Sequence, residues 1–195
     1  MTLDIKIEPR VETKGVIYPD DTAYNGLYFS DKLKINYYNF YYSYGKHFQP
    51  KSIFEIGVRA GYTGYFLLKG SETKKYRGID LENYWPGSNN KAQKLLQRVC
   101  DDVEVTLLNS HSLKKLDQLY ELIHVDGDHS YNGKVLDLEL ALANLAPNGV
   151  IVVDDYTNTN ETGKIVKKAT DDFIKKHKLK YQVFGTYTGH ALLMV

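Results

Sequence analysis

Two short acidic segments carry the side chains of this 195-residue chain that are best suited to chemistry. Residues 126–131 read DGDHSY and residues 154–156 read DDY, and each segment follows a run of apolar residues. Carboxylates that meet at one point repel one another unless they bind protons or share a cation. Oxygen ligands without thiolates favour a hard divalent ion such as Mg²⁺, Mn²⁺ or Ca²⁺. We therefore predict a divalent-cation site if the fold brings the two segments together.

The same segments contain the candidates for a general base. His129 titrates near neutral pH when unperturbed, which suits proton transfer, and Asp128 is the alternative. A simpler interpretation uses Asp128 to cap the following helix and Asp155 to close a loop by hydrogen bonding. That interpretation accounts for two acids and leaves Asp126 and Asp154 unexplained.

A second group of candidates begins with Glu55 and the turn over residues 57–61. Gly57 and Gly61 allow the backbone to approach a ligand closely, and the free amides at a helix start favour an anionic group. Asp80 lies 19 positions after Gly61, where a carboxylate can accept hydrogen bonds from both hydroxyls of an adenosine ribose. Ser110 offers a polar group for an adenine edge, although helix capping explains it equally well. A tight turn without a ligand also explains the two glycines.

The elements that must position these residues alternate regularly after Pro50. Short β-branched runs and amphipathic segments take turns, which is typical of βαβ units around a mostly parallel sheet. We expect strands at 52–57, 76–80, 103–109, 122–126, 150–154, 181–187 and 190–194. We expect helices at 35–45, 62–69, 89–100, 112–119, 133–145 and 163–177. Ser88 and Ser112 are the expected caps of two of these helices, and Pro147-Asn148-Gly149 is expected to end the helix over 133–145. In such sheets, ligands bind beyond the carboxyl ends of the strands, where the candidate residues stand.

The end of the chain refines the expected fold. Only Thr188 and Gly189 separate the last two strands, whereas a parallel crossover needs roughly a dozen residues. The last strand must therefore run antiparallel. The expected fold is α/β: a Rossmann-like, seven-stranded, mostly parallel sheet with an antiparallel C-terminal hairpin and helices on both faces.

Composition excludes several classes of protein. The chain is 43% hydrophobic and 25% charged, as in soluble globular domains. It has no run of 18 apolar residues and no signal-peptide pattern. We therefore expect a cytoplasmic protein without membrane contact. Cys100 is the single cysteine, which excludes an internal disulfide and a multi-thiolate zinc site. A net charge of +1 argues against a nucleic-acid partner.

The chain changes character near Pro50. Eight of its 17 tyrosines precede this residue, in a segment without regular strand patterning. Tyrosine rings with polar edges suit a binding cleft or lid, although half-exposed packing is as common. We therefore divide the chain into a tyrosine-rich lid or substrate segment over residues 1–50 and a second region over residues 51–195.

The motifs resemble a known superfamily. Residues 52–195 look like a class I S-adenosylmethionine (SAM)-dependent methyltransferase, which also ends in an antiparallel hairpin. Residues 123–131 (IHVDGDHSY) and 147–156 (PNGVIVVDDY) are similar to the metal-dependent O-methyltransferases of the macrocin, mycinamicin and novobiocin type and to cephalosporin-hydroxylase-like proteins. The resemblance implies SAM and Mg²⁺ as cofactors and a hydroxylated sugar or a natural-product glycoside as the small-molecule acceptor.

The resemblance also implies roles for individual residues. Cofactor binding falls to Glu55, Gly57 and Gly61 at the methionine part, Asp80 at the ribose, Ser110 near the adenine, and Asp126. Metal binding falls to Asp126, Asp154 and Asp155. The catalytic base is His129 or Asp128, with His129 favoured.

Two other functions compete with methyl transfer. A nicotinamide-dependent oxidoreductase also uses a strand, a glycine turn and an acid, but the glycine spacing and the terminal hairpin disfavour it. A non-catalytic SAM-binding protein has no use for a cluster of acids that destabilises an empty site. The sequence leaves a homo-oligomer open.

Overall fold

The computed structural model describes residues 5–7, 16, 32–83, 85–186 and 188–195. The strands are β1 (Ser52–Ile56), β2 (Lys75–Asp80), β3 (Asp102–Leu107), β4 (Tyr120–Val125), β5 (Leu145–Val153), β6 (Lys180–Phe184) and β7 (His190–Met194). The helices are α2 (Lys32–Phe48), α3 (Tyr62–Gly70), α4 (Ser88–Leu96), α5 (Tyr131–Ala143) and α6 (Glu161–His177), with a 3₁₀ turn, η1, at Ser110–Ser112. Strands and helices alternate as the sequence predicts.

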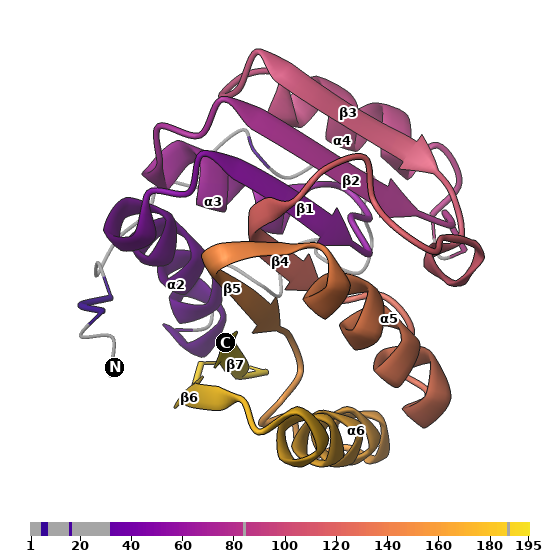
Figure 1. Ribbon diagram of the computed structural model, residues 1–195. Helices are drawn as coiled ribbons and strands as arrows, with labels where there is room; N and C mark the ends of the chain where they lie inside the picture. The colour runs from indigo at the N-terminus through magenta and orange to yellow at the C-terminus, as the bar shows by residue number, and fades with distance from the viewer. Residues whose placement is uncertain (1–4, 8–15, 17–31, 84, 187) are drawn as a thin grey trace.

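The strands form one sheet in the order β3-β2-β1-β4-β5-β7-β6 (Figure 1). The pairs from β3 to β5 are parallel, whereas β7 pairs antiparallel with both β5 and β6. β6 ends at Phe184, earlier than the predicted end at residue 187, so residues 185–189 connect it to β7. This connection is still too short for a parallel crossover and permits only a hairpin. The predicted fold class, including the antiparallel terminal hairpin, is confirmed.

Helices cover both faces of the sheet, and each face has its own apolar core. On one face, Ile53 and Leu122 pack with α2, α3 and α4; on the other, Phe54 and Ile123 pack with α5 and α6. Successive strand residues point to opposite faces, so neighbouring residues of β1 and β4 divide between the two cores. Within the described part of the chain, every helix is too short or too polar to serve as a transmembrane segment.

One predicted helix is wrong. Residues 112–119 form only the last residue of η1 and an irregular segment that leads into β4. Leu116 is buried, but Leu119 is 53% exposed. Packing therefore supports only part of the apolar stripe that would stabilise a short helix. Its position is instead fixed by the backbone amide of Leu116, which donates to the side chain of Asn144.

The predicted helix boundaries also need correction. The residue before α4 is Gly87 with a left-handed φ of 78°, so Ser88 is not the cap, and Ser112 starts no helix. Helix α5 ends at Ala143, and the Pro147-Asn148-Gly149 segment already belongs to β5. The observed N-caps are Ser130 for α5 and Asn160 for α6; each side chain accepts a backbone N–H three residues later.

The tyrosines of α2 belong to the core. Tyr37, Tyr38, Tyr41 and Tyr44 are at most 6% exposed, and α2 packs against α3 on the sheet. This confirms a helix around the predicted range 35–45 and places these rings inside the protein. Tyr42 of α2 is partly buried against the same core. The remaining tyrosines before Pro50, at positions 18, 24 and 28, lie outside the described residues, so a lid formed by them stays a prediction.

Close contact between α2 and α3 depends on Gly45. A Cβ added at this helical position would overlap the backbone carbonyl of Leu67 in α3, and backbone cannot move aside as a side-chain tip can. We expect Gly45→Ala to lower the free energy of unfolding by about 2 kcal/mol, measured by urea denaturation. Gly185→Ala is the control, since no atom of the described residues lies within 4 Å of the added Cβ. Equal losses of stability in both variants would contradict this view of the helix packing.

Candidate functional site

The parallel pairing of β4 and β5 brings the two acidic segments together. Val125 lies opposite Val153 in the ladder, so Asp126 and Asp154 directly follow paired residues. The backbone amide of Asp154 donates to the carbonyl of Val125 at 3.3 Å, and that of Asp126 donates to Ile56 at 2.8 Å. The convergence expected from the sequence is therefore present at the carboxyl edge of the sheet.

Asp126, His129 and Asp155 form the centre of this edge. The Nε2 atom of His129 lies 3.2 Å from Asp126 Oδ1 and 3.2 Å from Asp155 Oδ2. One ligand atom from each residue lies within 4.8 Å of the others. Asp126 keeps 28% of its side chain exposed and Asp155 keeps 17%, so the cluster is accessible to small ions. Two carboxylates and an imidazole at this spacing fit a divalent cation.

The charges in the cluster depend on one another. Burial and the nearby charge of Asp154 raise the pKa of Asp126 to about 6. Hydrogen bonds to Asp126 and to Asp155 raise the pKa of His129 to about 10. At neutral pH, an imidazolium therefore supplies the positive charge between the two carboxylates. An arrangement that concentrates negative charge in this way also attracts a metal ion.

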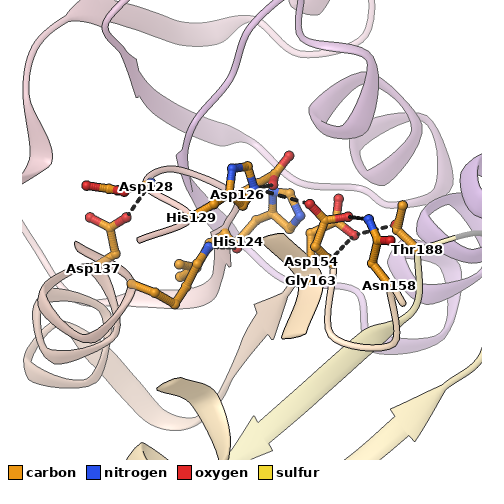
Figure 2. A network of polar contacts seen from close by, with 12 residues as sticks. His124, Asp126, Asp128, His129, Asp137, Asp154, Asn158, Gly163 and Thr188 are labelled. Atoms are coloured by element: carbon orange, nitrogen blue, oxygen red, sulfur yellow. Dashed lines mark hydrogen bonds and ion pairs between the residues drawn. The ribbon is translucent and has the colours of Figure 1, made fainter. Parts of the chain in front are cut away.

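Asp154, the third predicted metal ligand, is not one of the three residues of this cluster. Its carboxylate accepts hydrogen bonds from Tyr37 of α2 at 2.5 Å and from Thr188 at 3.0 Å, and it pairs with His190 of β7 at 3.1 Å. These partners hold the pKa of Asp154 far below its usual range, mainly through His190, although burial alone would raise it. Figure 2 shows Asp154 beside Thr188, with Asp126 and His129 farther along the same network.

Asp128 lies on the other side of the network, near Asp137 (Figure 2). Its Oδ1 accepts the backbone N–H of Ser130 at 2.7 Å at the start of α5, which lowers the pKa of the carboxyl despite some burial. The simpler sequence interpretation makes Asp128 the cap of this helix, but the observed cap is Ser130, and Asp128 instead forms the turn that precedes it. Of the two candidate bases, His129 is the one that lies between the acids of the cluster.

Asp137 links the loops that follow β3 and β4. This fully buried residue of α5 accepts from the hydroxyl of Ser110 at 2.6 Å and from the backbone N–H of Asp128 at 3.1 Å. Ser110, the predicted adenine contact, is thus held toward α5. Asp137 was not identified as a candidate from the sequence. Its only indication there is that an acid lies on the inward face of a helix, between Lys134 and Leu138.

The turn after β1 adopts backbone conformations that favour glycine. Gly57 has φ of 88°, and an added Cβ would overlap the backbone of Asp126. Gly61 has φ of 80°, and its missing Cβ allows Ala92 of α4 to approach. Close packing of β1 on β4 and of α3 on α4 therefore accounts for both glycines, with or without a ligand.

Asp80 organises the same turn. Its Oδ2 accepts the backbone N–H of Arg59 at 2.8 Å and its Oδ1 that of Glu82 at 2.6 Å. Each carboxylate oxygen can accept a second hydrogen bond, so the described contacts leave acceptor capacity for two ribose hydroxyls. The position of Asp80 at the end of β2, next to the turn, fits an adenosine-containing cofactor.

Glu55 is buried below this turn. Its carboxylate pairs with His124 of β4 at 3.0 Å and accepts from the hydroxyl of Tyr76. Neither His124 nor His190 was assigned a role from the sequence. Strand alternation is the missed signal, because Glu55 and His124 lie opposite each other in the ladder and share the face that α2 covers.

The sequence matches a known protein family over the part of the chain that forms the site. A protein family described as a methyltransferase domain matches residues 54–156, which is more than half of the chain. The match includes the end of β1, the glycine turn, Asp80 and both acidic segments. No curated protein matches the sequence.

Solved structures share the fold at low sequence identity. The SAH-bound methyltransferase of Podospora anserina has a TM-score of 0.64 and 16% identity, over 82% of this chain and 78% of that one. The SAH-bound O-methyltransferase of Bacillus cereus has a TM-score of 0.61 and 17% identity, over 80% and 79% of the two chains. The SAM-bound O-methyltransferase of Streptomyces achromogenes involved in tomaymycin synthesis has a TM-score of 0.63 and 16% identity, over 83% and 80%.

Proposed function

The chain belongs to the methyltransferase-domain family and has the fold of class I SAM-dependent methyltransferases, and on that premise we propose that it methylates a hydroxyl oxygen of a small molecule with the help of a divalent cation. The observation that carries this proposal is the convergence of Asp126, His129 and Asp155 at the carboxyl edge of the sheet. Two acids around a histidine suit deprotonation of a hydroxyl group better than they suit passive binding.

The cofactor side of the site is proposed from the turn after β1 and the end of β2. Asp80 binds the ribose hydroxyls, and Gly57 and Gly61 border the methionine part, with Glu55 beneath and Asp126 at the reacting end. Ser110 lies by the adenine. When bound, SAM supplies a methyl group on a positively charged sulfur, so this chain needs no covalent nucleophile of its own.

The reaction needs a deprotonated acceptor in line with that methyl group. The deprotonated form of His129 would take the proton of the acceptor hydroxyl at Nε2, and SAM would supply the methyl group. Asp126 and Asp155 orient the imidazole on both sides. Asp126 and Asp155 would hold a Mg²⁺ ion, which would supply a charge that lowers the pKa of the acceptor hydroxyl. Positioning and proton transfer together supply most of the catalysis.

The acceptor is proposed to be a hydroxylated sugar or a glycoside. The similarity of residues 123–131 and 147–156 to antibiotic-sugar O-methyltransferases supports this class. The O-methyltransferases among the structural neighbours support oxygen as the methylated atom. Residues 1–50 are proposed to contribute the acceptor-binding segment.

Methyl transfer from labelled SAM tests the proposal. We expect labelled product when the protein is incubated with Mg²⁺ and a panel of hydroxylated sugars and glycosides, loss of product in EDTA, and recovery when Mg²⁺ is restored. Calorimetry is expected to detect SAM and not NADH. Full activity in metal-free protein would exclude the role of the cation, and SAM binding without transfer to any acceptor would favour a non-catalytic cofactor-binding protein.

A further inference from the structure

Lys134 of α5 is a lysine inside the protein. Its side chain is fully buried, at 0% exposed, and the same inward face of the helix carries Asp137 and Leu138, which are also fully buried. Lysine is almost never fully buried unless it is paired, because its ammonium group loses strong hydration on burial. A lysine at this position therefore needs a compensating interaction.

The hydrogen bonds of Lys134 do not supply this compensation. Its Nζ atom donates to the backbone carbonyl of Val125 at 3.5 Å, which is long for a hydrogen bond. Asp137 lies one turn farther along α5, but its carboxylate accepts from Ser110 at 2.6 Å and from the backbone N–H of Asp128 at 3.1 Å. Within the described part of the chain, Asp137 forms no ion pair with Lys134. The compensation must therefore come from charges beyond the range of an ion pair.

The contact with Val125 places the ammonium group of Lys134 next to the acidic segments. The carbonyl of Val125 also accepts the backbone N–H of Asp154 at 3.3 Å, and the residue after Val125 is Asp126. The ammonium group therefore lies where β4 and β5 end, on the side of α5. This is the edge of the sheet at which the acids of the site converge.

The charges at this edge interact with one another and with Lys134. Burial and the charge of Asp154 raise the pKa of Asp126, so the acids repel each other. Hydrogen bonds to Asp126 and Asp155 raise the pKa of His129, and the positive charge of Lys134 opposes this rise. Lys134 thus acts on the same charges as the cluster does, across a partly buried region where solvent screens weakly.

From this placement we infer that Lys134 is an internal counter-charge of the site: its ammonium group balances the acids when no cation is bound and weakens, by repulsion, the binding of a divalent ion. The inference rests on the proposed cation-dependent function. Lys134 acts through the cluster and touches neither the cation nor the acceptor. Without its charge, carboxylates at this spacing would bind protons or move apart in the cation-free protein.

Lys134→Met tests the inference by the sign of its effect. Methionine is a flexible, unbranched side chain without charge, and replacing a buried charge by an apolar group often leaves stability unchanged or higher. If Lys134 repels the cation, the dissociation constant for Mn²⁺ falls by about 10-fold or more. If Lys134 only bonds to Val125, that constant stays unchanged or rises. Electron paramagnetic resonance of free Mn²⁺ measures it without SAM or acceptor, at mildly alkaline pH, where Asp126 with its pKa of about 6 is ionised.

Two further variants separate the buried charge from hydrogen bonding and from the net charge of the protein. Lys134→Gln keeps an N–H donor without the charge, so tighter Mn²⁺ binding is expected here too. Lys168→Met removes an exposed charge of α6 that pairs with Asp172 at 2.6 Å, and solvent screening predicts parental Mn²⁺ binding. Parental affinity in Lys134→Gln, or equal tightening in Lys168→Met, would overturn the inference.

The inference and the proposed function can fail separately. Unchanged or weaker Mn²⁺ binding in Lys134→Met would overturn the inference and leave the proposed function intact. Binding of Mn²⁺ by Lys134→Met and not by the parent would support the inference and overturn the cation dependence of the parent. Absence of Mn²⁺ binding in both proteins would overturn both.

The charge state of Lys134 gives an independent readout without any metal. The nitrogen chemical shift of a lysine side chain differs between the ammonium and the amine form, and the signal of Lys134 is assigned by its loss in Lys134→Met. We expect the ammonium form in the cation-free protein at neutral pH. A neutral amine under these conditions would overturn the inference, because an uncharged group neither balances the acids nor repels a cation.

Discussion

Asp126→Asn is expected to lower kcat by about 1,000-fold, because it removes one of the two negative charges that orient His129 and hold the cation. The asparagine side chain keeps the size of the aspartate and one carbonyl oxygen, so the packing at the end of β4 is preserved. The affinity for SAM is expected to change by only a few-fold, since Asp80 and the turn after β1 bind most of the cofactor in this proposal. Initial rates with labelled SAM and calorimetric titration of SAM measure the two effects separately.

The control for this variant is Asp102→Asn. Asp102 is an exposed acid at the start of β3, at the edge of the sheet opposite the site, where it pairs with Arg77 at 2.7 Å. Exposed ion pairs of this kind contribute little to stability. We expect parental kcat in this variant. An Asp126→Asn protein that turns over at the parental rate would show that the cluster is not the reaction centre.

The location of the site was predictable because it depends on topology alone. Asp80, Asp126 and the pair at 154–155 each follow an apolar run, and the connections between these runs are long enough for helices. Parallel strands then place all the acids at one edge of the sheet. The antiparallel end was equally predictable, because the connection between the last two apolar runs is too short for a parallel crossover; in the structure, residues 185–189 separate β6 from β7.

The partners of Asp154 were not predictable from the same patterns. Alternation along β5 places Asp154 on the face of Val150 and Val152, but the sequence does not reveal which helix covers that face. Helix α2 precedes the βαβ units, and the contacts of its tyrosines depend on how the helix packs against the sheet. Burial of Tyr37 and Tyr41 against the sheet is a tertiary effect that no local spacing reports.

The mistaken helix at 112–119 has a similar cause. Its apolar positions fit helical spacing, but a segment of this length forms a helix only when packing supports it. In the structure, Asp117 instead accepts from the hydroxyl of Tyr120 at 2.6 Å and pairs with Lys75 at 3.2 Å. Side chains that bond to neighbouring strands fix the segment in an irregular conformation.

The second large effect is expected for His129→Gln, with a loss of kcat between about 100-fold and 10,000-fold, the range for removal of a general base. Glutamine can still hydrogen-bond to Asp126 and Asp155, but it cannot accept the proton. The pKa of His129 is raised to about 10, so without a bound cation the imidazole is protonated at neutral pH. The parental rate at a limiting concentration of Mg²⁺ is therefore expected to rise as pH increases. A cation that shares the charge of the two carboxylates lowers this pKa, so a saturating concentration of Mg²⁺ should shift the rising limb to lower pH.

The pH profile therefore separates a base from a residue that only supports the cluster. The rising limb, and its shift with Mg²⁺, should disappear in His129→Gln and persist in Asp128→Asn, because Asp128 accepts from Ser130 at the start of α5 and lies on the side of Asp137. If Asp128→Asn removed the limb and His129→Gln kept it, the base would be Asp128. In that case the imidazole between the two acids would serve to balance their charge, and proton transfer would have to occur on the α5 side of the network.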